Sequence, residues 1–318
     1  MAGLGSKPDP EGTSVAQAPD LHSMSLESYP SISALNVARC RAIAAHETRE
    51  GIQGRDHLAE VFLGEAGRNS LLNPAIYSVI LEKVRAFSPG TYEYFIARTA
   101  YLDAVMEDAL RANIPQIVLL GTGYDTRAYR FAELIQDTWI FELDMPPTLA
   151  HKRALLAECG VTIPAQVTFL GVDFARESLS DRLFDAGYVT DQETLFIWEG
   201  VTYFLPPKAV DDTLRFVRQN SPAGSAICFD YMIPETEMAN RFGAQRAREA
   251  MRESYPAEPL QWDLDEGQVE AFLAERGFRL VEHLMPEMMQ QRYLTLADGS
   301  SAGPILDLFR IVKAAVRD

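Results

Sequence analysis

Cysteine is scarce in this sequence: only Cys40, Cys159 and Cys228 occur among 318 residues. They are odd in number, lie far apart and lack CxxC spacing, which argues against a disulfide framework. We predict buried thiols that pack as small apolar side chains. This cysteine usage is typical of a reducing compartment, so we expect a cytoplasmic protein.

Long apolar runs and basic clusters are also missing. No uninterrupted apolar run approaches the roughly 18 residues of a membrane span, so no membrane-spanning segment is expected. The chain carries 29 Lys+Arg against 45 Asp+Glu, a formal net charge of −16. An acidic surface without a run of Lys and Arg repels phosphate backbones and anionic lipid headgroups. We therefore expect no nucleic-acid or membrane partner; the sequence leaves the oligomeric state open.

Histidine is equally sparse, and metal-binding spacings are lacking. No H-x-H, HExxH, CxxC or clustered Asp/His pattern occurs, so no metal site is predicted. None of the five histidines stands in a motif, and each is interpreted as a surface or satisfied core residue: His22, His46, His57, His151 and His283.

What the sequence does contain is enough apolar material for a large folded domain. Hydrophobic residues make up 47% and charged residues 23% of the chain, a composition typical of globular proteins. The stretch from Met1 to Pro30 is rich in Gly, Pro, Ser and Asp and has no apolar core. We predict a flexible tail over residues 1–28, without a signal peptide, and a single domain over 29–318.

Short apolar runs alternate with helical segments in the middle of the chain. Helical patterns cover 147–159 and 206–219. The alternation predicts an α/β fold with a Rossmann-like, mostly parallel sheet covered on both faces. Its strands are expected at 116–120, 139–141, 167–170, 195–198 and 226–229.

Other patterns flank this core, which is assigned to residues 116–231. An N-terminal helical cap is predicted over 29–115, ending in a helix over 97–113. A charged helical stretch, 232–256, lies in a predicted lid insertion, 232–262. The remainder, 263–318, is expected to form a helix over 266–276 and an antiparallel C-terminal hairpin at the sheet edge, from strands 278–284 and 308–314. The sheet would then have seven strands, the arrangement of a methyltransferase-type sheet.

Two glycines follow the first predicted strand. Gly121 and Gly123 lie between this strand and the next helix, where glycine permits a sharp turn and close approach to a ligand. The third glycine of a dinucleotide fingerprint is replaced by Thr126, which disfavours a pyrophosphate. An adenosine ligand without pyrophosphate, such as S-adenosylmethionine, fits better. An NAD(P)-linked oxidoreductase remains the alternative.

Acidic residues end the next three strands. Asp144, 21 residues after Gly123, is positioned to accept hydrogen bonds from ribose hydroxyls, or else is a loop acid or helix N-cap. Asp173 could accept a hydrogen bond from an adenine amino group, with Phe174 against the ring; alternatively, Asp173 caps a helix starting near Glu177. Glu199 would face the methionine end of the ligand, where its charge favours a bound cation.

Three motifs of this sequence resemble those of a known family. They are Gly121-Thr-Gly-Tyr-Asp-Thr-Arg127, Phe141-Glu-Leu-Asp144 and Trp198-Glu-Gly-Val-Thr-Tyr203. The resemblance is to the leucine carboxyl methyltransferase superfamily of class I S-adenosylmethionine-dependent enzymes. More narrowly, it is to the bacterial and fungal branch with tetracenomycin-type polyketide O-methyltransferases. It covers roughly residues 32 to 315.

The resemblance implies roles for individual residues. Arg98 would pair with the methionine carboxylate, whereas its alternative is an ion pair with Asp103 or Glu93 on a surface helix. Glu199 would lie near the amino group of the cofactor's methionine portion. The other cofactor-binding residues would be those proposed above: Gly121, Gly123, Asp144, Asp173 and Phe174. No catalytic residue is assigned; Glu199 and Tyr203 are candidates. Asp125 and Arg127 are interpreted as a structural pair that stabilises the glycine loop.

The implied reaction is an in-line transfer of a methyl group to oxygen on a small molecule. A carboxylate acceptor needs no general base, whereas a phenol of a secondary metabolite would need one. The lack of a histidine motif favours the carboxylate. Four arginines after the fifth strand could guide an acidic substrate, or they could simply lie on the solvent-exposed face of an amphipathic helix: Arg241, Arg246, Arg248 and Arg252. The N-terminal segment departs from the phosphatase-modifying members, so methylation of a protein C-terminus is an alternative only.

Overall fold

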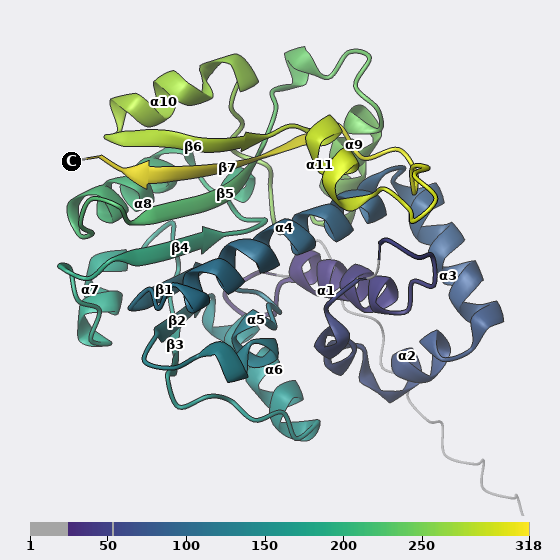
Figure 1. Cartoon of the computed structure of the whole chain (residues 1–318), viewed down its shortest axis with the longest axis horizontal. Coiled ribbons are helices and arrows are strands. Elements are labelled where there is room, and N and C mark those ends of the chain that lie inside the picture. Colours follow the sequence, from purple (N-terminus) through teal and green to yellow (C-terminus); the bar gives the residue numbers. More distant parts are fainter. Residues whose placement is uncertain (1–24, 53, 318) are drawn as a thin grey trace, which may run out of the picture.

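The computed structural model describes residues 25–52 and 54–317 (Figure 1). Most of the predicted tail therefore lies outside the described residues. Its last part, residues 25–28, forms a turn closed by a hydrogen bond from the Ser28 N–H to the Ser25 carbonyl.

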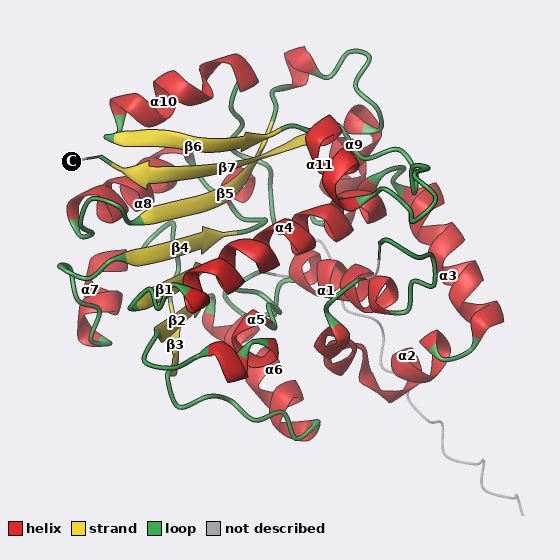
Figure 2. Cartoon of the chain, in the orientation of Figure 1, coloured by secondary structure: helices red, strands yellow, loops and turns green. Residues whose placement is uncertain are grey.

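Seven strands form one sheet in the order β3-β2-β1-β4-β5-β7-β6 (Figure 2). β7 alone runs in the direction opposite to the other six strands. This confirms the predicted seven-stranded, mostly parallel sheet. The strands are β1 (Gln116–Leu120), β2 (Trp139–Asp144), β3 (Val167–Gly171), β4 (Thr194–Trp198), β5 (Ala226–Met232), β6 (Phe278–Leu284) and β7 (Phe309–Val316).

The central strands form where the apolar runs predict them. Every residue of β1 and of β4 is buried, as expected for parallel strands covered on both faces. Val118 lies opposite Phe141 on one side and Phe196 on the other. The strand order reverses between β1 and β4, so a crevice opens at the carboxyl ends of these two strands.

The C-terminal strands differ from the predicted hairpin in their connection. β6 and β7 are antiparallel neighbours, but residues 285–308 join them and include helix α11 (Pro286–Tyr293). β7 lies between β5 and β6, so β6 alone forms the edge. The burial patterns agree, because β6 has exposed positions whereas β7 has none.

Helices flank the sheet and cover the carboxyl ends of its strands. In Figure 1 the long helix α4 passes in front of the sheet, and the arrow of β4 points toward the side on which α1, α2 and α3 lie. The α-helices of the cap and core are α1 (Ile32–Ala45), α2 (Gly64–Leu71), α3 (Pro74–Phe87), α4 (Thr91–Arg111), α5 (Arg127–Arg130), α6 (Pro146–Glu158), α7 (Leu179–Asp185) and α8 (Pro207–Gln219). Short 3₁₀ turns are η2 (His57–Leu63), η3 (Ala132–Leu134), η4 (Thr202–Phe204), η5 (Glu235–Glu237) and η6 (Glu266–Gln268).

The predicted lid segment is less helical than its composition indicated. Its one α-helix is α9 (Ala244–Ser254), and α10 (Val269–Glu275) follows later. Asn240 and Gly243 adopt positive φ angles of 66° and 70°, which a helix interior does not accommodate. The prediction of a polar surface helix was incomplete, because Ala244, Ala247 and Ala250 form a buried stripe on α9.

The cysteines lie in three environments. Cys228 is buried in β5, as predicted, and Cys40 is partly buried in α1. Cys159, directly after α6, is exposed, so the prediction of a buried thiol was wrong for this residue.

Candidate active site

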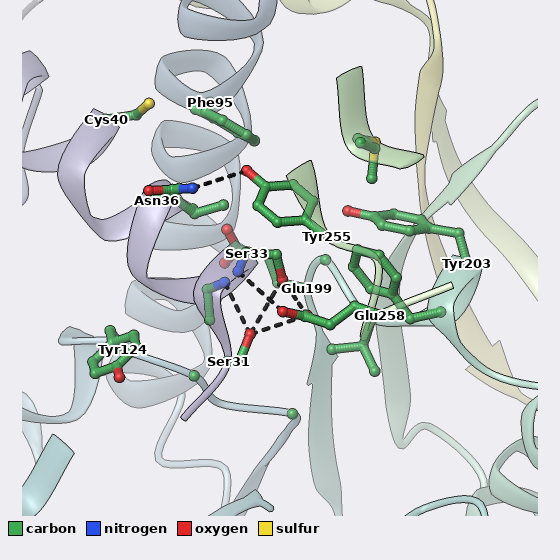
Figure 3. A pocket seen from close by; sticks show the side chains of 18 of the residues that line it. Ser31, Ser33, Asn36, Cys40, Phe95, Tyr124, Glu199, Tyr203, Tyr255 and Glu258 are labelled. Atoms are coloured by element: carbon green, nitrogen blue, oxygen red, sulfur yellow. Dashed lines mark hydrogen bonds between the residues drawn. The ribbon is translucent and has the colours of Figure 1, made fainter. Parts of the chain in front are cut away.

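A cavity of about 1140 Å³ lies between the carboxyl ends of the central strands and the helices of the cap (Figure 3). It brings together the strand-end residues that the sequence singled out. All of them line it: Gly121, Gly123, Asp144, Asp173, Phe174 and Glu199, together with Arg98 from α4 and Tyr203 from η4.

The glycine loop requires its glycines. Gly121 and Gly123 have φ angles of +65° and +49°, in the left-handed region. A β-carbon at Gly121 would lie 2.4 Å from Cγ2 of Val201. The N–H of Gly123 donates a 2.6 Å hydrogen bond to Oδ2 of Asp144, which ties the loop to the end of β2.

Asp144 is a partly buried carboxylate on the cavity wall. Its other oxygen accepts a 2.7 Å hydrogen bond from the Met145 N–H. Burial raises the pKa of Asp144 to about 6, against the opposing effect of the hydrogen bonds from Gly123 and Met145. Each carboxylate oxygen can accept a second hydrogen bond, so Asp144 retains capacity for two ribose hydroxyls.

Arg98 is not the surface residue of the alternative interpretation. It is 1% exposed, and its Nε lies 2.9 Å from Oε1 of Glu199, while Nη1 donates a 2.7 Å bond to Asp230. Within the described residues, Arg98 Nε and Glu199 Oε1 find no partner with hydrogen-bond geometry despite their proximity. A buried, incompletely bonded cation and anion on one cavity wall suit a zwitterionic amino-acid group.

Arg127 organises the acids behind Glu199. Its guanidinium contacts Asp103 at 2.8 Å, Asp125 at 2.6 Å and Glu199 at 2.7 Å. Burial alone would raise the pKa of Glu199, but Arg127 and Arg98 outweigh it and hold this pKa below its ordinary value. The pKa of Asp125 behaves similarly. Burial would raise it, but the charge of Arg127 outweighs burial and lowers this pKa to about 2. The structure thus contains the predicted Asp125–Arg127 pair and extends it to Glu199.

Asp173 and Phe174 line the cavity beyond β3. Asp173 does not cap the following helix as its alternative interpretation proposed. Its Oδ1 accepts a 2.9 Å bond from the Ala175 N–H in a local turn, whereas α7 begins later, with Ser178 as its N-cap. The adenine role stays a prediction.

The lid arginines do not lie on the cavity. Arg241 pairs with Glu266 and Asp307, and Arg248 contacts Asp263 and Glu235. Arg246 and Arg252 are likewise paired with acids, Glu253 and Glu235. The cavity instead meets the opposite side of α9, through Ala247, Ala250 and Met251. Arg241, Arg246, Arg248 and Arg252 are therefore not among the residues that line the cavity, and their guiding of an acidic substrate stays a prediction.

Tyr203 lines the cavity, and Asp230 supports its polar wall from behind through Arg98. Tyr203 is buried, and burial followed by the charge of Asp230 raises its pKa. Asp230, near the end of β5, accepts bonds from the Tyr94 hydroxyl, Arg98 and the Gly200 N–H. Sequence reasoning missed Asp230, although a carboxylate inside an apolar strand was a detectable signal.

A second missed group closes the cavity from the cap side. Glu258 accepts hydrogen bonds from the Ser31 hydroxyl at 3.1 Å, the Ile32 N–H at 3.1 Å and the Ser33 N–H at 3.1 Å (Figure 3). The Ser33 hydroxyl adds a fourth bond at 2.5 Å. Nothing in the sequence around Glu258 indicates this role, because its partners at the start of α1 are more than 220 residues away.

Histidines take no part in the cavity wall where the structure describes them. His46, His57, His151 and His283 all lie elsewhere, and His151 contacts the hydroxyl of Tyr124. Within residues 25–52 and 54–317, no group of three or more His, Cys, Asp or Glu is arranged to hold a metal ion. In the same residues, no helix combines the length and the apolarity that crossing a membrane requires.

A family model described as leucine carboxyl methyltransferase matches residues 34–218, more than half of the chain. The chain belongs to the leucine carboxyl methyltransferase family. This confirms the predicted resemblance at the level of the superfamily, whereas the narrower resemblance to tetracenomycin-type O-methyltransferases stays a prediction.

Curated relatives agree with this family. A Bacillus subtilis protein named "Putative S-adenosyl-L-methionine-dependent methyltransferase YktD" is 29% identical over 193 residues, covering 60% of this chain and 63% of the relative. A protein of the same description from Mycobacteroides abscessus is 30% identical over 275 residues, covering 82% and 87%. Some other matches are shorter: a relative from Mycobacterium marinum is matched over 49% of its length.

Solved structures confirm the fold. A DUF574 family protein from Streptomyces avermitilis aligns with a TM-score of 0.57 at 16% identity, over 88% of this chain and 96% of that one. A structure described as a "putative methyltransferase" from Thermobifida fusca aligns with a TM-score of 0.56 at 17% identity, over 96% and 100%.

The residues present fit the cofactor of this family. Asp144 has spare acceptor capacity beside the glycine loop, and Arg98 and Glu199 offer incompletely bonded charges of opposite sign. The expected cofactor, S-adenosylmethionine, agrees with the family and with the names of the relatives.

Proposed function

We propose that this chain is an S-adenosylmethionine-dependent O-methyltransferase that methylates the carboxylate of a small molecule. One observation carries the proposal: a single cavity joins the glycine loop, Asp144 and the Arg98–Glu199 pair to a chamber beneath the cap helices. A cofactor and an acceptor can therefore meet inside it.

The cofactor end assigns a task to each side chain. Asp144 would hold the ribose, while Arg98 and Glu199 would hold the carboxylate and amino groups of the methionine portion. Asp173 and Phe174 would receive the adenine. When bound, S-adenosylmethionine supplies a methyl carbon activated by the positive sulfur.

The acceptor end favours an oxygen that is already ionised. Tyr203 has a raised pKa and stays protonated near neutral pH, so its hydroxyl can donate a hydrogen bond but cannot serve as a base. None of the four described histidines lines the cavity. A carboxylate acceptor needs no base, because it is already ionised near neutral pH and its methylation would release no proton.

Positioning then supplies the catalytic effect. Holding the acceptor oxygen and the methyl carbon in line at near-contact distance can contribute about 7–11 kcal/mol. The cavity wall formed by Arg98, Glu199 and Tyr203, with Asp230 bonded to Arg98 behind it, suits this task.

Mass spectrometry of the purified protein with S-adenosylmethionine and panels of carboxylic acids, phenols and C-terminal peptides tests the proposal. A product gaining one methyl group that mild base removes would be the expected ester. A base-stable methyl ether as the main product would instead identify a hydroxyl acceptor. Peptide methylation without any small-molecule product would contradict the proposed substrate class.

A further inference from the structure

The cavity is larger than the cofactor end requires. Its volume of about 1140 Å³ exceeds the roughly 300–1,000 Å³ of pockets that hold one drug-sized ligand. The strand-end residues occupy only its inner part. The rest, here termed the cap chamber, is the portion walled by α1, α3, α4 and α9.

The walls of the cap chamber are mainly apolar. α9 contributes the small residues Ala247 and Ala250, so the space beside this helix is left open rather than filled by side chains. The larger apolar side chains come from the cap helices and include Val37, Ile43, Ile80, Val84, Phe87 and Phe95. Transfer of an apolar chain from water into the chamber would raise its binding affinity about fourfold for each buried methylene.

The mouth of the chamber combines the apolar side chain of Phe87 with the cationic side chains of Lys83 and Arg246. Phe87 lines the cavity and is also 51% exposed, so it marks a point where the chamber reaches the surface. Arg246 of α9 lies over the Phe87 ring at 5.6 Å, which places α9 and α3 together at this mouth. Ile76 lies on the same face of α3 as Ile80 and Phe87, and it is 44% exposed. The apolar surface therefore continues from inside the cavity onto the outer part of α3.

Two tyrosine hydroxyls lie at the inner end of the chamber, beside the charged side chains of Glu199 and Glu258 (Figure 3). The Tyr255 hydroxyl accepts a 3.1 Å hydrogen bond from the Asn36 side chain on the cavity wall, and Tyr203 lies on the same side of the cavity (Figure 3). Burial raises the pKa of both tyrosines, so both remain donors near neutral pH. They can hydrogen-bond a carboxylate without repelling it.

We infer that the acceptor is an amphiphilic carboxylic acid with an elongated apolar chain. Its carboxylate lies near Tyr203 and Tyr255, and its chain runs through the cap chamber toward Phe87. This inference rests on the proposed function and narrows its substrate class.

Binding and turnover of a chain-length series test it. Calorimetry without cofactor would measure the affinity for hexanoate, decanoate and tetradecanoate, and mass spectrometry would measure their methyl esters. We expect affinity and kcat/KM to rise at least tenfold from hexanoate to decanoate. Equal values across the series would overturn the inference while leaving the proposed function standing. Methylation of none of these acids would also overturn the inference, whereas the proposed function would fall only if the wider panel of carboxylic acids gave no methyl ester.

A matched pair of variants on α3 locates the chain. Ile80→Trp fills the chamber from a helix that has no buried residues, so folding should survive. It should lower the affinity for tetradecanoate at least tenfold and leave hexanoate and S-adenosylmethionine binding unchanged. Ser78→Trp, on the exposed side of the same helix and off the cavity, should change neither.

A second pair on α9 gives an independent readout. Ala250→Leu, on the chamber wall, should shift the preferred chain to a shorter acid, whereas Glu249→Leu on the exposed face should not. Unchanged chain-length preference in both Ile80→Trp and Ala250→Leu would place the acceptor outside the chamber and overturn the inference.

Discussion

Asp144 joins two roles in one side chain, because it bonds the glycine loop and faces the cavity. Its pKa of about 6 is well above the 3.8 of an ordinary aspartate, so protonation occurs in an accessible pH range. The ionised form accepts ribose hydroxyls best. We expect the dissociation constant for S-adenosylmethionine to rise as the pH falls through about 6, up to tenfold per pH unit.

Replacing this carboxylate provides the matching test. Asp144→Asn should weaken cofactor binding roughly 10–100-fold, because hydrogen bonds to a charged group are worth about 1.5–3 kcal/mol. It should also remove the pH dependence near 6. Asp137→Asn, at the exposed opposite end of β2, is the control. Calorimetry that finds the same pH profile in Asp144→Asn and in the unaltered protein would refute the role of Asp144.

Arg127 makes a separate prediction about stability. Arg127→Met would leave Asp103, Asp125 and Glu199 without their shared cation in a buried region. We expect a loss of about 3–5 kcal/mol in the free energy of unfolding, measured with urea.

An exposed arginine gives the comparison for this loss. Arg215→Met removes a partner of Asp212 at a side chain that is 58% exposed, and should cost less than about 1 kcal/mol. Similar losses for the two variants would show that Arg127 is not a structural centre.

The sequence located individual site residues better than their partners. Gly121, Asp144 and Glu199 were predictable because they follow apolar strands whose ends share one sheet edge. The contacts of Arg98 with Glu199 and Asp230 could not be predicted, because they depend on how α4 crosses β4 and β5. A motif specifies a position along one strand, whereas a partner 132 residues away is set by packing.

At the scale of elements, Glu258 connects the segment after α9 with the first turn of α1. Its carboxylate complements both the free N–H groups and the positive end of the helix dipole. We expect Glu258→Gln to loosen this connection and to accelerate hydrogen exchange in residues 31–35 about tenfold. Mass spectrometry of exchanged peptides would measure the change.

The same measurement should leave a surface variant unaffected. Glu253→Gln alters an acid near the end of α9, five residues before Glu258, that is 64% exposed and lies 3.4 Å from Arg246. If exchange in residues 31–35 were equal in Glu258→Gln and Glu253→Gln, Glu258 would not hold the start of α1.

Elements buried on two faces were the most predictable ones. β1 and β4 coincide with the apolar runs in the sequence. Both faces of these parallel strands are buried, so no polar residues interrupt the apolar pattern. The lid segment was less predictable. Its composition is charged throughout, and only the local backbone at Asn240 and Gly243 limits the helix to α9. The connection through α11 depends on tertiary packing against α4, which no local pattern reveals.

At the scale of the whole molecule, the net charge of −16 opposes an anionic acceptor. Salt screens this repulsion, since the Debye length falls from about 30 Å at 0.01 M to about 8 Å at 0.15 M. We expect kcat/KM for a carboxylic acid to rise a few-fold over this range, while binding of zwitterionic S-adenosylhomocysteine stays constant. Steady-state kinetics showing a fall with salt would reveal local attraction that outweighs the net charge.

The convergence of the ends of β1, β2 and β4 on one cofactor is the central claim. Equilibrium dialysis with radiolabelled S-adenosylmethionine, in the presence and absence of excess NADH, tests it most directly. The account predicts saturable binding of one molecule per chain that NADH does not displace. Absence of saturable binding, or displacement by NADH, would contradict it.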